Sequence, residues 1–330
     1  MTFTPLPPSA IKQAHNRIAP YIRRTPLMES SLLNNMLGHD IIFKVEGFQK
    51  IGAFKFRGAL NALLSLKEKG ELPKEVVTFS SGNHAQGVAL AGKLLGVNTT
   101  ILMTQSSSPI KQQATRSYGA NLITTPTRQE AEAKTKELAE QGAYFIHPFD
   151  NDMVIAGQGT ACLEALEDGV KPNAIFGTCG GGGWLSGTYL ASRLLAPDSL
   201  VFAGEPLNAN DASQSYKTGN IVKFENAPKS IADGALSLCL SPRTFHYLKQ
   251  LNGFYEVTEE EIIYWTQWLS HLLKTTVEPS SAVAMAAAHK WLKTQKTRQR
   301  VLVMLSGGNV APETYRMVWE NNYLDRLPGI

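Results

Sequence analysis

Cysteine is scarce in this chain, and the three cysteines, Cys162, Cys179 and Cys239, show no metal-like spacing. So sparse and odd a set predicts no disulfide framework and favours a reducing compartment. Long apolar runs are also missing, since the richest one, Ala282–Ala288, is far too short to span a bilayer. The first residues lack a basic head before an apolar core, so we expect no signal peptide. These absences predict a cytoplasmic protein with no membrane partner.

Strong charge of one sign is absent as well. The net charge is only +4, and the basic residues are scattered rather than gathered in a run. This distribution argues against a nucleic-acid partner. The chain has 330 residues, of which 43% are apolar and 18% charged. That balance is typical of a globular enzyme, and the length suits two lobes or one large α/β unit with an insertion.

Short apolar runs alternate with amphipathic segments along most of the chain. We expect strands near residues 41–45, 76–79, 100–103, 120–123, 143–147, 174–178, 200–204 and 301–305, and helices over most of the intervals, among them 58–69 and 129–141. Strands that alternate with helices predict parallel βαβ units with buried strands. The polar stretch 208–229 has little periodicity and is expected to be a functional or mobile loop.

Lys55 is the residue around which the chemistry is organised. It follows a Gly-Ala-Phe turn and precedes an expected helix. Partial desolvation and nearby helix N-terminal dipoles would both disfavour the charged amine. A neutral lysine is a nucleophile that forms Schiff bases with aldehydes, pyridoxal phosphate among them. An isolated lysine at such a place would more simply start an amphipathic helix, so the other motifs decide between the two interpretations.

Four consecutive glycines, Gly180, Gly181, Gly182 and Gly183, stand between an expected strand and an expected helix. They let backbone N–H groups converge at a helix N-terminus, which favours a phosphate cradle over a flexible turn. The run matches neither G-x-G-x-x-G nor the Walker pattern, which argues against dinucleotide binding or ATP hydrolysis.

Two further loops follow expected strands. The N–H groups and hydroxyls of Ser80-Ser-Gly-Asn-His84 suit a small anion such as a substrate carboxylate, although an ordinary helix cap would use the same residues. Ser306-Gly-Gly-Asn309 offers a serine that could bond a ligand or simply end a strand. Together with Lys55 and the glycines, these loops fall at the carboxyl ends of expected parallel strands, where open α/β sheets bind ligands.

Seven motifs in this order resemble the fold-type II pyridoxal-phosphate enzymes, and more closely their serine/threonine dehydratase and serine racemase branch. The motifs are Gly52-Ala-Phe-Lys-Phe-Arg-Gly58, Ser80-Ser-Gly-Asn-His84, Ile155-Ala-Gly-Gln-Gly-Thr160, Gly180–Gly183, Glu205-Pro206, Glu278-Pro-Ser280 and Ser306-Gly-Gly-Asn-Val310. The resemblance implies a two-domain α/β fold like that of the tryptophan synthase β chain, with open twisted, mostly parallel sheets flanked by helices. It implies a large cofactor-binding domain of residues 1–47 and 144–330 and a small inserted domain of residues 48–143.

The resemblance also implies roles for single residues. Lys55 would hold pyridoxal 5'-phosphate through a Schiff base and then take the Cα proton of the substrate, and Ser81 on the opposite face would be the proton donor that racemisation needs. Phe54 would pack by the ring, Asn83 would bond its 3-hydroxyl, the four glycines would hold its phosphate, and Ser306 would face its nitrogen. The substrate would be bound by Ser80, Ser81, Gly82, Asn83 and His84.

A divalent cation is implied in the same way. Glu205 and Asp211 are six residues apart with the Ala209 carbonyl between them, a spacing that binds a cation in the racemase branch. Oxygen-only ligands suit Mg²⁺, or Ca²⁺ or Mn²⁺. A solvated acidic loop is the simpler alternative.

The expected activity is dehydration and deamination of L-threonine, L-serine or both to a 2-oxo acid and ammonia. The alternatives are serine racemase or 3-hydroxyaspartate dehydratase on the same scaffold. Phe149 in His147-Pro-Phe-Asp150 favours a dehydratase, whereas Trp184 and Ser281 depart from the small residues usual at their positions. A non-catalytic protein that binds the cofactor or an amino acid is a different class, against which the intact Lys55 argues.

The chain ends soon after the Ser306 motif, so we expect a stand-alone enzyme without a regulatory domain, working as a homodimer or homotetramer.

Overall fold

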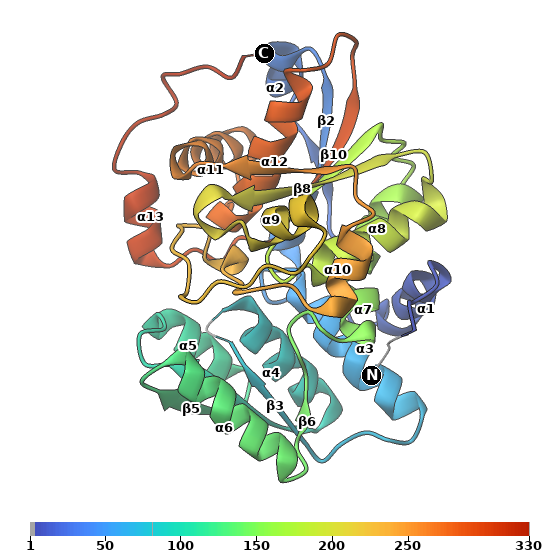
Figure 1. Ribbon diagram of the computed structural model, residues 1–330, viewed down its shortest axis with the longest axis vertical. Coiled ribbons are helices and arrows are strands. Elements are labelled where there is room, and N and C mark those ends of the chain that lie inside the picture. The colour runs from blue at the N-terminus through green and yellow to red at the C-terminus, as the bar shows by residue number, and fades with distance from the viewer. Residues whose placement is uncertain (1–3, 81, 330) are drawn as a thin grey trace.

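The computed structural model describes residues 4–80 and 82–329, which form two sheets flanked by helices (Figure 1). The strands are β1 Leu27–Glu29, β2 Asp40–Val45, β3 Glu75–Phe79, β4 Asn98–Thr104, β5 Asn121–Thr125, β6 Tyr144–Phe145, β7 Ala174–Thr178, β8 Leu200–Pro206, β9 Gly253–Val257 and β10 Arg300–Leu305. The larger sheet has the order β1-β2-β10-β7-β8-β9, and the smaller has the order β5-β4-β3-β6. All pairs are parallel except β1 with β2, at the edge of the larger sheet. The expected α/β class with mostly parallel sheets is confirmed.

Helices fill the intervals between the strands. They are α1 Ser9–Ile18, α2 Ser31–Leu37, α3 Lys55–Glu68, α4 Asn83–Leu95, α5 Pro109–Ser117, α6 Arg128–Glu140, α7 Asp152–Glu167, α8 Gly183–Leu195, α9 Asp211–Thr218, α10 Pro242–Leu248, α11 Glu259–Leu273, α12 Pro279–Leu292 and α13 Pro312–Val318, with short 3₁₀ turns η1 Glu46–Phe48, η2 Leu207–Ala209 and η3 Asp233–Ala235. None of the described helices is long and apolar enough to cross a membrane.

The larger sheet is covered on both faces, and its strands show why. Side chains of a strand alternate between faces. Phe43, Val303 and Phe176 pack with α11 and α12, whereas their neighbours Ile42 and Leu302 pack with α1, α7 and α8. Both sets are apolar and buried, which is the pattern of a parallel sheet between two helical layers.

The smaller sheet lies in the lower part of Figure 1, with α3 and α4 against one face and α6 against the other. Its strands all fall within residues 75–145. The domain limits expected from the sequence, with residues 48–143 as an insertion, stay a prediction.

Two expectations about the elements differ from the structure. The polar stretch 208–229 contains α9, and the helix expected from Gly58 begins at Lys55 instead. Gly58 lies inside α3, at the point where this helix crosses α7. A Cβ built on Gly58 would come within 2.9 Å of the Val154 carbonyl oxygen, so the close crossing requires a glycine here. The close crossing ties the start of α3, and with it Lys55, to α7.

Candidate active site

A cavity of about 670 Å³ lies at the carboxyl ends of β3, β7 and β10. It is lined by most of the residues that the sequence singled out: Phe54, Lys55, Ser80, Gly82, Asn83, His84, Gly180, Gly181, Gly182, Gly183 and Ser306. The structure therefore brings together residues that are up to 252 positions apart, from Phe54 to Ser306. Ser81, the expected proton donor, lies outside the described residues.

The Lys55 amine is held at the cavity wall by few polar contacts. Its Nζ donates to the Pro148 carbonyl oxygen at 2.9 Å and lies 5.1 Å from the centre of the Phe54 ring. Burial lowers the pKa of Lys55 to about 8, against a smaller opposing effect of Glu278. At pH 7, about a tenth of this amine is therefore uncharged and nucleophilic, a far larger fraction than for an ordinary lysine.

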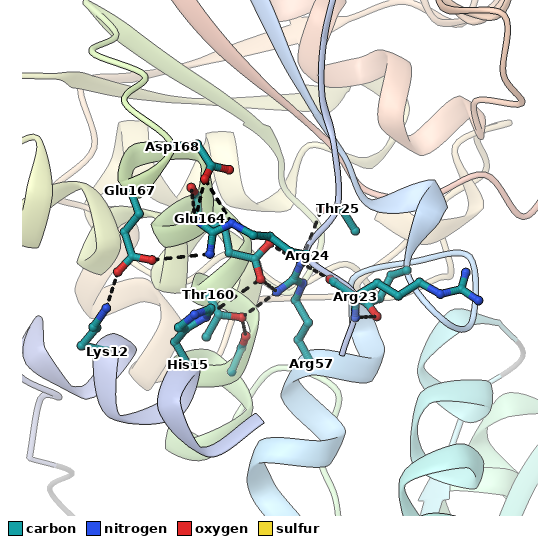
Figure 2. A network of polar contacts seen from close by, with 12 residues as sticks. Lys12, His15, Arg23, Arg24, Thr25, Arg57, Thr160, Glu164, Glu167 and Asp168 are labelled. Atoms are coloured by element: carbon teal, nitrogen blue, oxygen red, sulfur yellow. Dashed lines mark hydrogen bonds and ion pairs between the residues drawn. The ribbon is translucent and has the colours of Figure 1, made fainter. Parts of the chain in front are cut away.

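The helix that carries Lys55 is anchored by a fully buried cluster of four charges, which we call the Arg57 cluster: Lys44, Glu46, Arg57 and Glu164. Arg57 donates to Glu46 through Nε and Nη2 at 2.7 and 2.9 Å, and to Glu164 through Nη1 and Nη2 at 2.7 and 2.8 Å. Figure 2 shows its guanidinium reaching from α3 toward Thr160 and Glu164 on α7. Lys44 completes the cluster by donating to Glu164 at 2.7 Å. The start of α3 is thus bonded to η1 and α7, and Glu164 links it further to Lys44 on β2.

The four glycines form a loop that no side chain could enter. A Cβ on Gly181 would lie 2.1 Å from the Phe149 ring, and one on Gly183 would lie 2.9 Å from the Phe149 backbone. Gly182 has a φ of +84°, which favours glycine. Because the loop leads into α8, its backbone N–H groups can converge on an anion. These residues fit the phosphate of the expected cofactor.

Phe54 and Trp184 make one wall of the cavity. Their rings stack with centroids 4.1 Å apart, and Trp184 is 5% exposed. The bulky residue after the glycines is thus a partner for Phe54 as well as part of the cavity wall.

Ser306 and Asn83 are linked through a buried carboxyl. Ser306 Oγ donates to Glu278 Oε1 at 2.6 Å, and Asn83 Nδ2 donates to Glu278 Oε2 at 3.0 Å. Asn83 Oδ1 in turn accepts from Asn309 at 2.8 Å. These contacts hold Ser306 and Asn83 in place, and both side chains fit their expected roles beside the cofactor ring.

The N-terminus of α4 faces the same cavity. Asn83 and His84 open this helix, and Ser80 and Gly82 precede it, so free N–H groups and a hydroxyl suit an anion such as a carboxylate. Burial, aided by the charge of Lys55, lowers the pKa of His84 to about 3. His84 is therefore neutral and positions the site through its Nε2, which lies 3.0 Å from the Ile146 carbonyl oxygen.

Two cationic side chains besides Lys55 line the cavity, and the sequence did not single them out. Lys111 on α5 pairs with Asp233, and Arg128 at the start of α6 pairs with Glu132 at 2.8 Å and lies 5.9 Å from the centre of the Phe79 ring. The helix α6 is rich in charged residues, and its fold position turns its first residue toward the cavity. Glu278 belonged to a predicted motif but had no predicted role.

Glu205 and Asp211 come together outside this cavity, and both are fully buried. Glu205 accepts from the Ala212 and Ser213 N–H groups at 3.1 and 2.8 Å, whereas neither carboxylate oxygen of Asp211 has a partner among the described residues. Burial and the charge of Asp211 raise the pKa of Glu205, and burial raises that of Asp211 to about 7. Ala209, on the turn between them, is buried too. Two buried carboxyl groups, of which Asp211 has two unpartnered oxygens, fit a cation, although the described residues hold no group of three or more acidic, histidine or cysteine ligands.

Comparison with known proteins places these features in a family. Residues 18–307 match the family described as pyridoxal-phosphate dependent enzyme. The chain is 41% identical to the L-threo-3-hydroxyaspartate ammonia-lyase of Saccharomyces cerevisiae, with 92% of this chain and 94% of that protein covered. It is 43% identical to the serine racemase of Dictyostelium discoideum, with 91% and 94% covered. Among solved structures, the maize serine racemase is similar at a TM-score of 0.89 and 34% identity, with 96% and 98% covered.

Proposed function

Since the chain belongs to the pyridoxal-phosphate-dependent enzymes, in the branch of serine/threonine dehydratases and serine racemases, we propose that it removes the β-hydroxyl and the amino group of a hydroxy amino acid. The observation that carries the proposal is the cavity itself. It places an amine of lowered pKa, a glycine loop for a phosphate and a helix N-terminus for a carboxylate around one space. The products would be a 2-oxo acid and ammonia.

The residues divide the work as follows. Gly180–Gly183, Ser306, Asn83 and Lys55 would hold pyridoxal phosphate, which supplies an electron sink for the negative charge that develops at the substrate Cα. The N-terminus of α4 would bind the α-carboxylate and so orient the Cα–H bond. Lys55 Nζ would then take the Cα proton as general base. Loss of the β-hydroxyl as water leaves an enamine, and its hydrolysis releases ammonia.

We propose 3-hydroxyaspartate as the preferred substrate, ahead of the L-threonine and L-serine that the sequence favours. One relative supports this order, since the yeast protein is named for 3-hydroxyaspartate. The cavity supports it as well, because a second carboxylate needs a cation. Arg128 lines the same cavity as Lys55. A guanidinium there can bind a carboxylate through two N–H groups.

The substrate order is tested by measuring 2-oxo acid release from L-threo-3-hydroxyaspartate, L-threonine and L-serine with the cofactor-loaded protein. We expect the hydroxyaspartate to give the highest kcat/KM. Arg128→Met should lower that value by about 10- to 100-fold, as expected for loss of one charge-assisted pair, and spare the two monocarboxylates. Lys134→Met, on the exposed side of the same helix, is the matched control. An equal loss on all three substrates would contradict the role of Arg128.

Serine racemisation is the second candidate, and the racemase of Dictyostelium favours it. Racemisation needs a proton donor on the face opposite Lys55, for which the sequence predicts Ser81. Loss of D-serine formation in Ser81→Ala with retained 2-oxo acid release would establish this activity beside elimination. Release of 2-oxo acid alone in the unmodified protein would dismiss it.

We also propose that Glu205, Asp211 and the Ala209 carbonyl bind Mg²⁺, Ca²⁺ or Mn²⁺. The support is the unpartnered pair of Asp211 oxygens in a fully buried place. These hard cations take oxygen ligands and fill the remaining positions with water. A bound cation would stabilise the folded protein, and Asp211→Asn should abolish that stabilisation.

A further inference from the structure

Lys111 and Arg128, the cavity cations that the sequence did not single out, both contact one short segment of the chain. Lys111 pairs with Asp233, and Arg128 Nη1 donates to the Leu236 carbonyl oxygen at 3.3 Å. We call this segment, Asp233–Ser237, the bridging segment, and it contributes to the cavity lining. The two cations belong to α5 and α6, beside the smaller sheet, whereas the bridging segment is bonded to α12 on the larger one. These contacts therefore span the cavity.

The backbone of the bridging segment is fixed, but its aspartate side chain is not. Ala235 is fully buried, and the Gly234 N–H donates to Ser280 Oγ at 2.9 Å. The side chain of Asp233 is 51% exposed, whereas that of Lys111 is 13% exposed. Asp233 can therefore turn into water without a movement of the backbone, while Lys111 stays at the cavity wall.

We propose that Asp233 is a specificity-determining residue, which competes with the second carboxylate of a dicarboxylic substrate for Lys111. While no substrate is bound, the Asp233 carboxylate occupies Lys111. The second carboxylate of 3-hydroxyaspartate displaces it, so Lys111 joins Arg128 in binding that carboxylate. L-Serine and L-threonine have no second carboxylate and leave the pair intact. The inference rests on the proposed function, since it assigns 3-hydroxyaspartate to this cavity.

The nature of the pair favours such an exchange. An ion pair with a half-exposed partner is weak, because water competes for the charges. The Lys111 ammonium has three donors, but two carboxylates beside it would repel each other. Asp233 thus opposes a dicarboxylate in two ways: it has to leave Lys111, and its negative charge acts against the incoming one. A monocarboxylate does not have to overcome the first of these.

The ratio of kcat/KM for L-threo-3-hydroxyaspartate to that for L-serine, measured as 2-oxo acid release by the cofactor-loaded protein, tests the proposal. In Asp233→Asn the ratio should rise about 3- to 10-fold, mainly through a lower KM for the hydroxyaspartate, because Lys111 is released. Lys111→Met should lower the ratio. Asp198→Asn is the matched control and should leave it unchanged, because this exposed aspartate lies next to the amino end of β8, whereas the cavity lies at the carboxyl ends of the strands.

A double variant separates the release of Lys111 from the simple loss of a negative charge. Asp233→Asn made in the Lys111→Met protein should give a much smaller rise, because the pair is already absent. Asp233→Ser replaces Asp233→Asn if the asparagine variant does not fold. An unchanged or lower ratio after loss of the aspartate, or an equally large rise in the Lys111→Met background, would overturn the proposal.

Binding of succinate gives a readout that does not depend on turnover. Succinate has two carboxylates on four carbons, as aspartate has, but no amino group that could react, so calorimetry with the cofactor-loaded protein reports binding alone. Asp233→Asn should lower its dissociation constant about 3- to 10-fold, and Lys111→Met should raise it. Equal dissociation constants in all three proteins would overturn the proposal. If the unmodified protein binds succinate but releases 2-oxo acid from no hydroxy amino acid, the proposed function is rejected instead.

Discussion

Two regions of this molecule bury charge in opposite ways. The Arg57 cluster holds two cations and two carboxylates, all fully buried, and its carboxylate oxygens accept hydrogen bonds from Arg57 or Lys44. Glu205 and Asp211 are just as buried, yet they carry charge of the same sign, and both Asp211 oxygens lack a partner among the described residues.

The pKa shifts follow that difference. Burial would raise the pKa of Glu164, but Arg57 and Lys44 outweigh it and lower the pKa. Within the described part of the chain no cation does the same for Glu205 and Asp211, so burial raises the pKa of both. A buried charge without a partner in its own chain is costly, and a chain tolerates it where a ligand supplies the partner. The comparison therefore supports a structural role for the first region and agrees with the cation binding proposed for the second.

The largest effect is expected from Arg57→Met. This change leaves Glu46 and Glu164 with Lys44 as the remaining cation of the cluster, and removal of one partner from a buried pair costs about 3–5 kcal/mol of unfolding free energy. Urea unfolding of the purified protein measures it. Arg298→Met, which breaks the exposed pair with Asp40, is the control and should cost less than about 1 kcal/mol. A loss from Arg57→Met as small as that of the control would show that the cluster is not what holds α3 in place.

A smaller change in stability is expected when Glu205 and Asp211 bind a divalent cation. Added Mg²⁺, Ca²⁺ or Mn²⁺ at 100 times its dissociation constant should stabilise the protein by about 2.7 kcal/mol, and EDTA should reverse this. Thermal unfolding measures the shift. Asp211→Asn should abolish the response, whereas Asp198→Asn, at an exposed aspartate, should retain it. A cation response that survives in Asp211→Asn would place the site elsewhere.

The third expected effect is a difference in pH dependence. The pKa of Asp211 is raised in the folded protein to about 7, so the folded state binds more protons than the unfolded state between that value and the ordinary pKa of about 4. Without a cation, this group makes stability fall as pH rises through the window. A bound cation should cancel that decline, because it favours the ionised carboxylates.

Glu164 has the opposite sign. Its lowered folded-state pKa contributes stability above the ordinary glutamate pKa, and that contribution is lost as pH falls. Urea unfolding at about pH 5 and about pH 8, with EDTA and with Mg²⁺, isolates the Asp211 effect, because the other titrating groups are common to both series. A cation stabilisation that is no larger at the higher pH would argue against the carboxylate pair as its cause.

The sequence predicted which residues gather around the cavity better than it predicted the other residues that line it, and the reason is local. Gly180–Gly183 and Ser306 follow β7 and β10, and Lys55 opens the helix that follows β2, so their position in a parallel sheet follows from the order of the elements. Arg128 and Glu278 could not be placed in this way. Whether the first residue of α6 meets solvent or the cavity depends on how that helix lies on the smaller sheet, which charge pattern alone does not determine.

Gly58 shows the same limit of prediction from the sequence. The sequence pattern puts a helix start at Gly58, whereas this glycine is the contact point between α3 and α7, where no larger side chain fits. The partner that requires a glycine lies far away in the sequence, in this case at Val154 and Gln158. The helix α9 is missed because its polar composition hides the few buried residues, Ala212 among them, that fix it.

The most direct test of the central claim is to locate the lysine that holds the cofactor. The cofactor-loaded protein is reduced with borohydride, which fixes a Schiff base covalently, and its digest is analysed by mass spectrometry. We expect a single pyridoxyl group on the peptide that contains Lys55, and none in Lys55→Ala. A label on Lys111, which lines the same cavity, or the absence of any label would contradict the account.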